Sequence, residues 1–416
     1  MSAEQLNEVI RLLESESLEQ RNSAADTLSE LGMNGLSTEE GLIALRAATK
    51  KFPPRDSDYW DSATDLVIAA GRHPTPDYVP VVVELFSQFN SKARVEAVRL
   101  LATIEEPAAA VALMNIMREH ARSGGIQDLP IHALQDNPRH ANIFFPKILD
   151  YADMPAFEWD IYLLCLKYLQ AALIHGVDLT PYSARVLESY RKYKFQLRAA
   201  QQASGIAWMW EENYRKCREM GCLLLDLFGY FPTPEIEKEI REASTYSDPK
   251  IKLFAAISVL RYGKKINPRV IFEVAQSAEV RSILYEELDK LNRSSLFPDE
   301  YWTDEASAES NLVRWLAFPT ELDRVPDEIE LMKIVSIKSE SSVGLLDYYV
   351  FRFRTNEPHW SAKDGWMAGI SGPVPREEVD SELLYGHTFS QFEPWDNKTP
   401  EEHLDQILGI TSRHNS

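Results

Sequence analysis

A short motif that recurs along the first two thirds of the chain constrains its fold more than any other feature. Gly71–Tyr78 and Gly229–Ile236 both read glycine, two residues, Pro-Thr-Pro, an acidic residue and an aromatic or aliphatic residue. Threonine is a favourable helix N-cap, proline fits the first helical position, and glycine suits the end of the preceding helix. The motif therefore predicts that one helix ends and another begins within a few residues. Looser copies at 175–182 and 263–270 predict the same.

The spacing of these turns indicates a repeat. Gly71 and the next such turn at Glu105 are 34 residues apart, as are Gly229 and Gly263. Glu105 and Gly176 are 71 residues apart, which is room for two more units. One pair of helices for each 34 to 40 residues is typical of an α-solenoid, in which each pair packs only against its neighbours.

The segment Asp248–Leu260 carries Asp-Pro, Ile-Lys, an Ala-Ala pair and a final leucine, and Asn90–Leu101 is a looser copy. This pattern resembles the second helix of HEAT repeats, and the resemblance covers roughly residues 1–290. It implies a stack of antiparallel helix pairs with an extended binding surface. HEAT motifs describe a shape and imply no particular activity.

The pattern changes after residue 291. A loop is followed by a predicted helix at Asp304–Leu316, and a linker ends near Pro326. Hydrophobic residues then alternate with period two, which is typical of strands. The predicted strands are Ile329–Ile337, Leu345–Arg354, Trp366–Ser371 and His387–Phe392, with a C-terminal helix over 399–408. We therefore predict a mainly α protein, in which a HEAT-like α-solenoid (1–320) precedes a small α+β domain with an antiparallel sheet (325–416).

One face of the strand Leu345–Arg354 carries Tyr349, Phe351 and Phe353. Each such ring contributes about 1.5–3 kcal/mol when it is buried, so a small sheet is not expected to leave them exposed. We expect either the C-terminal helix or the helix that contains Trp315 to cover this face.

The charge of the chain limits its partners. It has 64 acidic and 44 basic residues, a formal net charge of −20, and residues 325–416 alone contain 16 acids and 8 bases. This balance argues against unspecific binding to nucleic acid or to anionic membranes, which depends on lysine and arginine. No apolar run approaches the roughly 18 residues of a membrane span. Three cysteines and an N-terminus without a visible secretory signal predict a reduced, cytoplasmic protein whose oligomeric state is open.

The segment 185–218 differs from this acidic background, with eight basic and three acidic residues. Its tryptophans could pack in the core, line a protein-binding groove or stack on bases, and we expect core packing first. Its basic residues could attract an acidic partner segment, together with a second patch one repeat later, or pair with local glutamates. The candidate binding residues are Arg191, Lys192, Lys194, Arg198, Trp208, Trp210, Tyr214, Arg215, Lys264 and Lys265.

A second candidate is the long connection between two predicted strands, residues 355–366. It contains His359, Trp360, Asp364 and Trp366. Long polar and aromatic loops often bind ligands, but these residues could equally close the open end of the sheet, and we favour that structural role.

No pattern in the sequence predicts catalysis. Phosphate-binding loops, dinucleotide fingerprints, the Gly-x-Ser-x-Gly elbow and His-Glu pairs are absent. Cys217 and Cys222 would lie about 140° apart on a helix and do not converge on a metal. We therefore expect no catalytic residues, no cofactor and no metal, and we predict a protein-binding scaffold. The alternative is an enzyme that acts on nucleic acid or nucleotides through the stretch 185–218.

Overall fold

The structure is a computed structural model, and it describes residues 3–55, 61–126, 128–201, 207–338, 344–356, 365–375 and 392–414. The chain divides into two compact units, unit 1 (Met1–Ser189) and unit 2 (Tyr190–Ser416). Each unit is described by itself.

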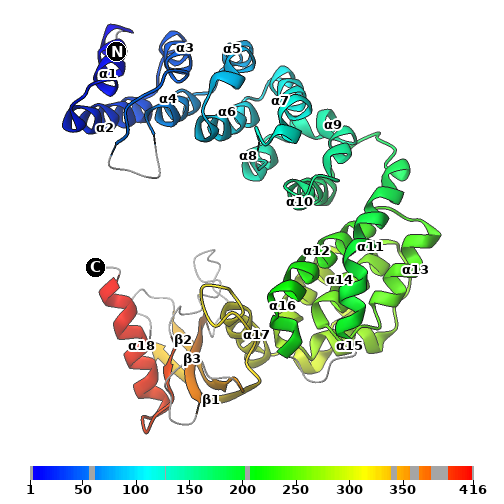
Figure 1. The fold of residues 1–416 in the computed structure, drawn as a ribbon. Helices are drawn as coiled ribbons and strands as arrows, with labels where there is room; N and C mark the ends of the chain where they lie inside the picture. Colours follow the sequence, from blue (N-terminus) through cyan, green and yellow to red (C-terminus); the bar gives the residue numbers. More distant parts are fainter. Residues whose placement is uncertain are drawn as a thin grey trace. The chain divides into compact units, whose positions relative to one another are not determined.

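Unit 1 consists of helices that pack neighbour to neighbour in two layers (Figure 1). The helices α1, α3, α5, α7 and α9 follow one another in one layer, and α2, α4, α6, α8 and α10 form the other, the even-numbered layer. Their bounds are α1 (Ala3–Leu13), α2 (Leu18–Asn34), α3 (Thr38–Ala47), α4 (Ser62–Gly71), α5 (Tyr78–Leu85), α6 (Ser91–Thr103), α7 (Pro107–His120), α8 (Ile131–Gln135), α9 (Ala141–Phe144) and α10 (Glu158–Gln170). Short 3-10 helices are η1 (Phe86–Gln88), η2 (Ala121–Ser123), η3 (Pro138–His140), η4 (Lys147–Tyr151) and η5 (Thr180–Tyr182).

Several of these helices begin at a polar N-cap residue. The side chains of Asp61 and Asn90 accept hydrogen bonds from the backbone N–H of Thr64 (2.8 Å) and Ala93 (2.9 Å), which would otherwise lack a partner. The expected N-cap at Thr75 does not form, because α5 begins only at Tyr78, three residues after Thr75. There the N–H of Tyr78 donates to the carbonyl oxygen of Thr75 (3.2 Å), so backbone turns take the place of the hydroxyl cap.

Unit 2 continues the helical pattern. α12, α14, α16 and α17 pack successively against one another, and α13 and α15 lie against this layer. The bounds are α12 (Glu212–Phe228), α13 (Pro234–Ala243), α14 (Pro249–Arg261), α15 (Pro268–Ala275), α16 (Ala278–Lys290) and α17 (Asp304–Leu316), with η6 (Ala207–Trp210), η7 (Ser294–Leu296) and η8 (Asp299–Tyr301). α11 (Ser183–Ala200) contains the division between the units. Thr233, Asp248 and Asn267 cap α13, α14 and α15, each followed by proline, and the repeated motif predicts the caps at Thr233 and Asn267.

Strands occur in the described part of the chain only after residue 327. The sheet contains β1 (Glu328–Lys338), β2 (Leu345–Arg354), β3 (Trp366–Pro375) and β4 (Glu393–Pro394), antiparallel and in that order. The predicted fourth strand, 387–392, lies outside the described residues except for Phe392, and β4 follows it directly. The mainly α class with a C-terminal antiparallel sheet is thus confirmed. The domain division between 1–320 and 325–416 stays a prediction.

Both faces of the sheet are covered by helices. Tyr349, Phe351 and Phe353 pack with Leu312 and Leu316 of α17, as expected for this aromatic face. The opposite face, with Tyr348, Val350 and Ile370, packs with Leu404 and Ile407 of α18 (Pro400–His414). Each helix therefore buries one face, and α17 belongs both to the helical layer and to the core of the sheet.

Candidate binding surfaces

Two of the predicted basic residues of α11, Arg191 and Lys194, are paired with acids of α13. Lys194 Nζ lies 2.5 Å from a carboxylate oxygen of Glu239 and 2.7 Å from one of Glu242. Arg191 also reaches Glu239, at 3.6 Å. Burial opposes the charge of Lys194, but the two carboxylates hold its pKa above the ordinary value. For Arg191 and Lys194, the structure thus shows the second of the two alternatives, pairing with local glutamates.

Of the remaining predicted bases, two form ion pairs and three are exposed. Lys264, in the turn before α15, pairs with Glu237 of the same α13, so α13 brings the α11 residues and Lys264 to one helix. Arg215 pairs instead with Asp323, beyond α17. Lys192 and Arg198 on α11, and Lys265 beside Lys264, are exposed.

The predicted aromatic residues lie largely inside unit 2. Trp208 and Tyr214 are buried and contact each other edge to face, with ring centroids 4.8 Å apart. Tyr214 donates a hydrogen bond to Asp248 (2.7 Å), and Trp210 lies under the guanidinium of Arg218, 5.5 Å from its ring centroid. Trp208 and Tyr214 therefore pack in the core, the first of the three expected interpretations.

Arg218, which the sequence did not single out, is the centre of this cluster. It donates to Asp248, the N-cap of α14, and to both oxygens of Glu279 (2.8 and 2.7 Å) at the start of α16. Burial opposes its charge, but the two carboxylates hold the pKa of Arg218 above its ordinary value. The cluster joins three successive helices of one layer.

The second predicted site lies mostly outside the described residues. This applies to His359, Trp360 and Asp364. Trp366 begins β3, and its ring contacts the guanidinium groups of Arg352 (4.5 Å) and Arg354 (4.8 Å) on β2. Both arginines also pair with glutamates of β1. Trp366 therefore packs on side chains that connect β1 and β2.

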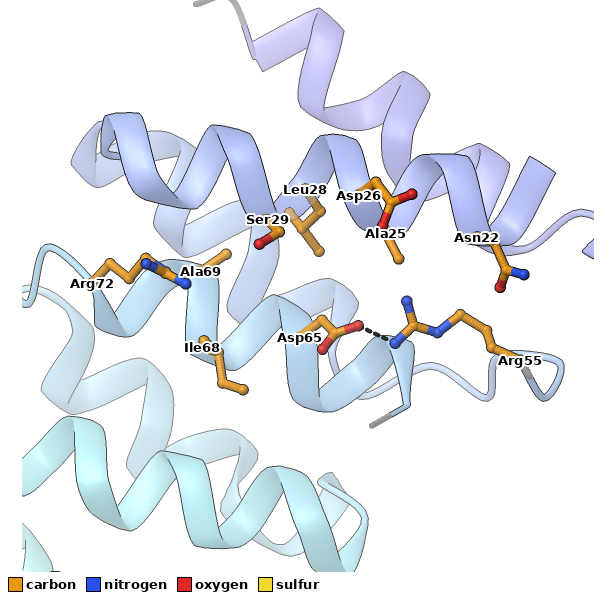
Figure 2. Close-up of a pocket in the computed structure, with 10 residues that line it drawn as sticks. All are labelled: Asn22, Ala25, Asp26, Leu28, Ser29, Arg55, Asp65, Ile68, Ala69 and Arg72. Atoms are coloured by element: carbon orange, nitrogen blue, oxygen red, sulfur yellow. Dashed lines mark hydrogen bonds and ion pairs between the residues drawn. The ribbon is translucent and has the colours of Figure 1, made fainter. Parts of the chain in front are cut away.

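Unit 1 contains a groove that the sequence did not indicate. It lies between α2 and α4 and has a volume of about 570 Å³. Figure 2 shows its two walls, with Ala25 and Leu28 from α2 and Ile68 and Ala69 from α4. These side chains give the groove an apolar floor.

Charged and polar side chains stand at the edges of this groove. Arg55 reaches Asp65 in an ion pair at one end (Figure 2). Burial raises the pKa of Asp65 above its ordinary value, against the opposing effect of Arg55. Among the described residues, the side chains of Asp26 and Ser29 on α2 and of Arg72, the C-cap of α4, have no hydrogen bond or ion pair. The groove therefore offers a free acceptor, a free donor and a hydroxyl that can do both.

A second hollow lies next to the groove in the even-numbered layer. It lies between α4 and α6, has a volume of about 230 Å³, and shares Ile68 and Arg72 with the first. Glu96 and Arg99 of α6 line it and pair with each other (2.9 Å). The two hollows together cross three helices, which is more suited to an extended chain than to a compact small molecule.

Comparisons with protein-family models, with curated proteins and with solved structures found no match. In the described ranges, no group of three or more histidine, cysteine, aspartate or glutamate side chains is arranged to hold a metal ion. No helix within those ranges combines the length and apolar character that crossing a membrane requires.

Proposed function

We propose that this protein is a non-catalytic scaffold that binds an extended segment of a partner protein along the even-numbered layer of unit 1. The observation that carries the proposal is the pair of neighbouring hollows over α2, α4 and α6, which share the lining residues Ile68 and Arg72. The helices that pack neighbour to neighbour in two layers support it, because helical-repeat solenoids present extended binding surfaces. The three free cysteines fit the predicted cytoplasmic location.

The chemistry of the groove matches a peptide. An extended segment presents backbone N–H and carbonyl groups that the solenoid must satisfy when it displaces water. Asp26 can accept from such N–H groups, Arg72 can donate to carbonyl oxygens, and Ser29 can do either. The apolar floor made by Leu28 and Ile68 would take up a small aliphatic side chain.

The surface at 191–265 is a weaker candidate. Lys194 and Lys264 are already paired with glutamates of α13, so they offer less positive charge to an acidic partner than the sequence suggested. The same pairing reduces the support for an enzyme that would hold nucleic acid through 185–218, which would need free positive charge.

Site-specific photocrosslinking tests the proposal in the full-length protein. A benzoylphenylalanine at Ser29, on the groove, should give a defined adduct with one partner in the cells that make this protein. The same group at Val111, a residue of α7 in the other layer that is 50% exposed, is the matched control and should give none. Equal adducts at both positions would count against the groove.

The groove must also be needed for the capture. Arg72→Glu should reduce the Ser29 adduct at least tenfold, since it reverses the charge of a free base in the groove. Arg118→Glu, an exposed arginine on α7, makes the same charge change outside the groove and should leave the adduct intact. An adduct that survives Arg72→Glu would contradict the proposal.

A further inference from the structure

Unit 2 contains a third hollow, lined by aromatic side chains, between α16 and α17, with a volume of about 530 Å³. We call it the Trp302 pocket. Its walls are the rings of Tyr285 on α16, and of Phe297, Tyr301 and Trp302 in the connection to α17. Asp304 and Glu305, in the first turn of α17, line the same pocket.

The rings are arranged as perpendicular walls. Tyr285 and Trp302 have their centroids 4.6 Å apart and their planes at 79°, and Phe297 and Trp302 lie 5.9 Å apart at 71°. Trp302 is 56% exposed although its neighbours are partly or fully buried. A large apolar ring left in water beside a hollow is a feature typical of binding sites.

The charges at the pocket favour a cation. Asp304 and Glu305 are exposed, and within the described part of the chain neither has an ion pair or side-chain hydrogen bond. The N-terminal end of α17 contributes a charge of only about +0.5, which is smaller than the two carboxylate charges. The arginine of the pocket, Arg281, does not reverse this balance, because Glu309 lies 2.7 Å from it.

Arg281 is an example of a guanidinium that is bound beside an aromatic ring of this pocket. It is buried, donates to the carbonyl oxygens of Ala275 (2.8 Å) and Ala306 (2.9 Å), and lies 4.7 Å from the ring centroid of Tyr301. Its donors are thus occupied within the protein. Among the described residues, no such guanidinium lies over Tyr285 or Trp302, and the two free carboxylates line the same pocket as these rings.

We propose that the Trp302 pocket binds an arginine side chain of a partner protein, with the guanidinium against the ring of Trp302 and in ion pairs with Asp304 and Glu305. Aromatic faces attract cations, and arginine stacks on them more often than lysine does. Its planar fork also matches carboxylates in two parallel hydrogen bonds. The inference rests on the proposed scaffold function, because it supplies a second anchor point for a protein partner.

A titration with small capped peptides tests the pocket without the partner. The full-length protein, labelled with ¹⁵N at its nine tryptophans, gives an indole N–H signal for each of them, and Trp302→Phe identifies the one from Trp302. Acetyl-Gly-Arg-Gly-amide should shift this signal saturably. The same peptide with citrulline, the neutral isostere of arginine, should bind at least about tenfold more weakly, since it lacks the charge. Equal shifts with both peptides would overturn the proposal.

Variants of the acids complete the test. Asp304→Asn with Glu305→Gln should weaken the arginine peptide about tenfold, and added salt should weaken it in the wild-type protein. Asp299→Asn with Glu300→Gln removes two nearby exposed acids that do not line the pocket and is the matched control. If the control weakens binding equally, the attraction is unspecific and the pocket is not the site. If the arginine peptide does not bind while the Ser29 adduct forms as expected, only the arginine pocket is rejected. If the peptide binds while the Ser29 adduct does not form, only the α2–α4 groove is rejected.

Discussion

Arg218 and Asp248 are joined by two hydrogen bonds, of 2.8 and 3.2 Å, and both side chains are almost completely buried. Asp248 is also the N-cap of α14, where it accepts from the backbone N–H of Lys250 (2.8 Å). One carboxylate thus begins a helix and fixes the preceding helix of the layer to it. Glu279 extends this connection to α16 through the same guanidinium.

Removing this guanidinium should destabilise unit 2 strongly. Arg218→Ala leaves Asp248 and Glu279 buried without their counter-charge, and a broken buried pair of this kind costs about 3–5 kcal/mol. Arg241→Ala removes an exposed ion pair with Glu237, which is worth about 1 kcal/mol or less. Urea unfolding of both variants measures the difference. Similar losses in the two proteins would show that the buried cluster contributes little.

The close approach of α17 to the sheet can be tested at Gly369. A Cβ atom there would lie 2.9 Å from Cε1 of Phe353 and 3.2 Å from the Leu312 methyl groups, so Gly369→Ala overpacks the interface. We expect a loss of about 1–3 kcal/mol. Gly409→Ala in α18, where nothing lies within 4 Å, should be neutral or slightly stabilising. Thermal unfolding compares them, and a neutral Gly369→Ala would mean that α17 does not press on β3.

His140 should make stability depend on pH. Burial lowers its pKa, and backbone groups of Ile104 and Glu106 only partly oppose this effect. The ordinary pKa of histidine is about 6.5, so below that pH the unfolded chain takes up a proton that the folded protein resists. This contribution to stability is therefore complete above about pH 6.5 and is lost as the pH falls through the lower, folded pKa.

The measurement is the melting temperature between pH 7.5 and 4.5. His140→Leu should reduce the decline toward acid pH relative to wild type. His132→Leu, at an exposed position of α8, should retain it. If His140→Leu declines as steeply as wild type, other groups cause the acid sensitivity.

Deleting residues 325–416 should destabilise the remaining helices and promote their self-association. The deletion uncovers Leu312 and Leu316 of α17, which are fully buried against Phe351 and Phe353 in the intact chain. Light scattering should show self-association, and the melting temperature should fall. A monomer that melts at the wild-type temperature would instead establish 325–416 as an independent module.

Much of unit 2 could be predicted because its signals are local. The caps Thr233, Asp248 and Asn267 act within three residues, and α17 and β2 have the bounds that their periodicity predicts. Thr75 shows the limit of such signals, since the same Pro-Thr-Pro motif there leads into backbone turns and not a hydroxyl cap.

The sites could not be predicted, because they depend on contacts between distant residues. Lys194 pairs with glutamates 45 and 48 residues away, so the sequence of its segment could not show that this charge is balanced. The residues Phe297 and Trp302 stood in a predicted loop, and only its path brings them to Tyr285. Likewise, Asp26 and Arg72 meet at one groove only because α2 packs on α4.

The shared position of α17 has a consequence for local opening of the chain. Its buried side chains contact both α16 and the sheet, so amide protons of β2 and β3 should exchange with solvent through the same cooperative opening as those of α16. A ligand held at Asp304 and Glu305 would stabilise the first turn of α17 and so make that opening rarer. Occupation of the Trp302 pocket would then be registered as slower hydrogen exchange in strands that the ligand never touches.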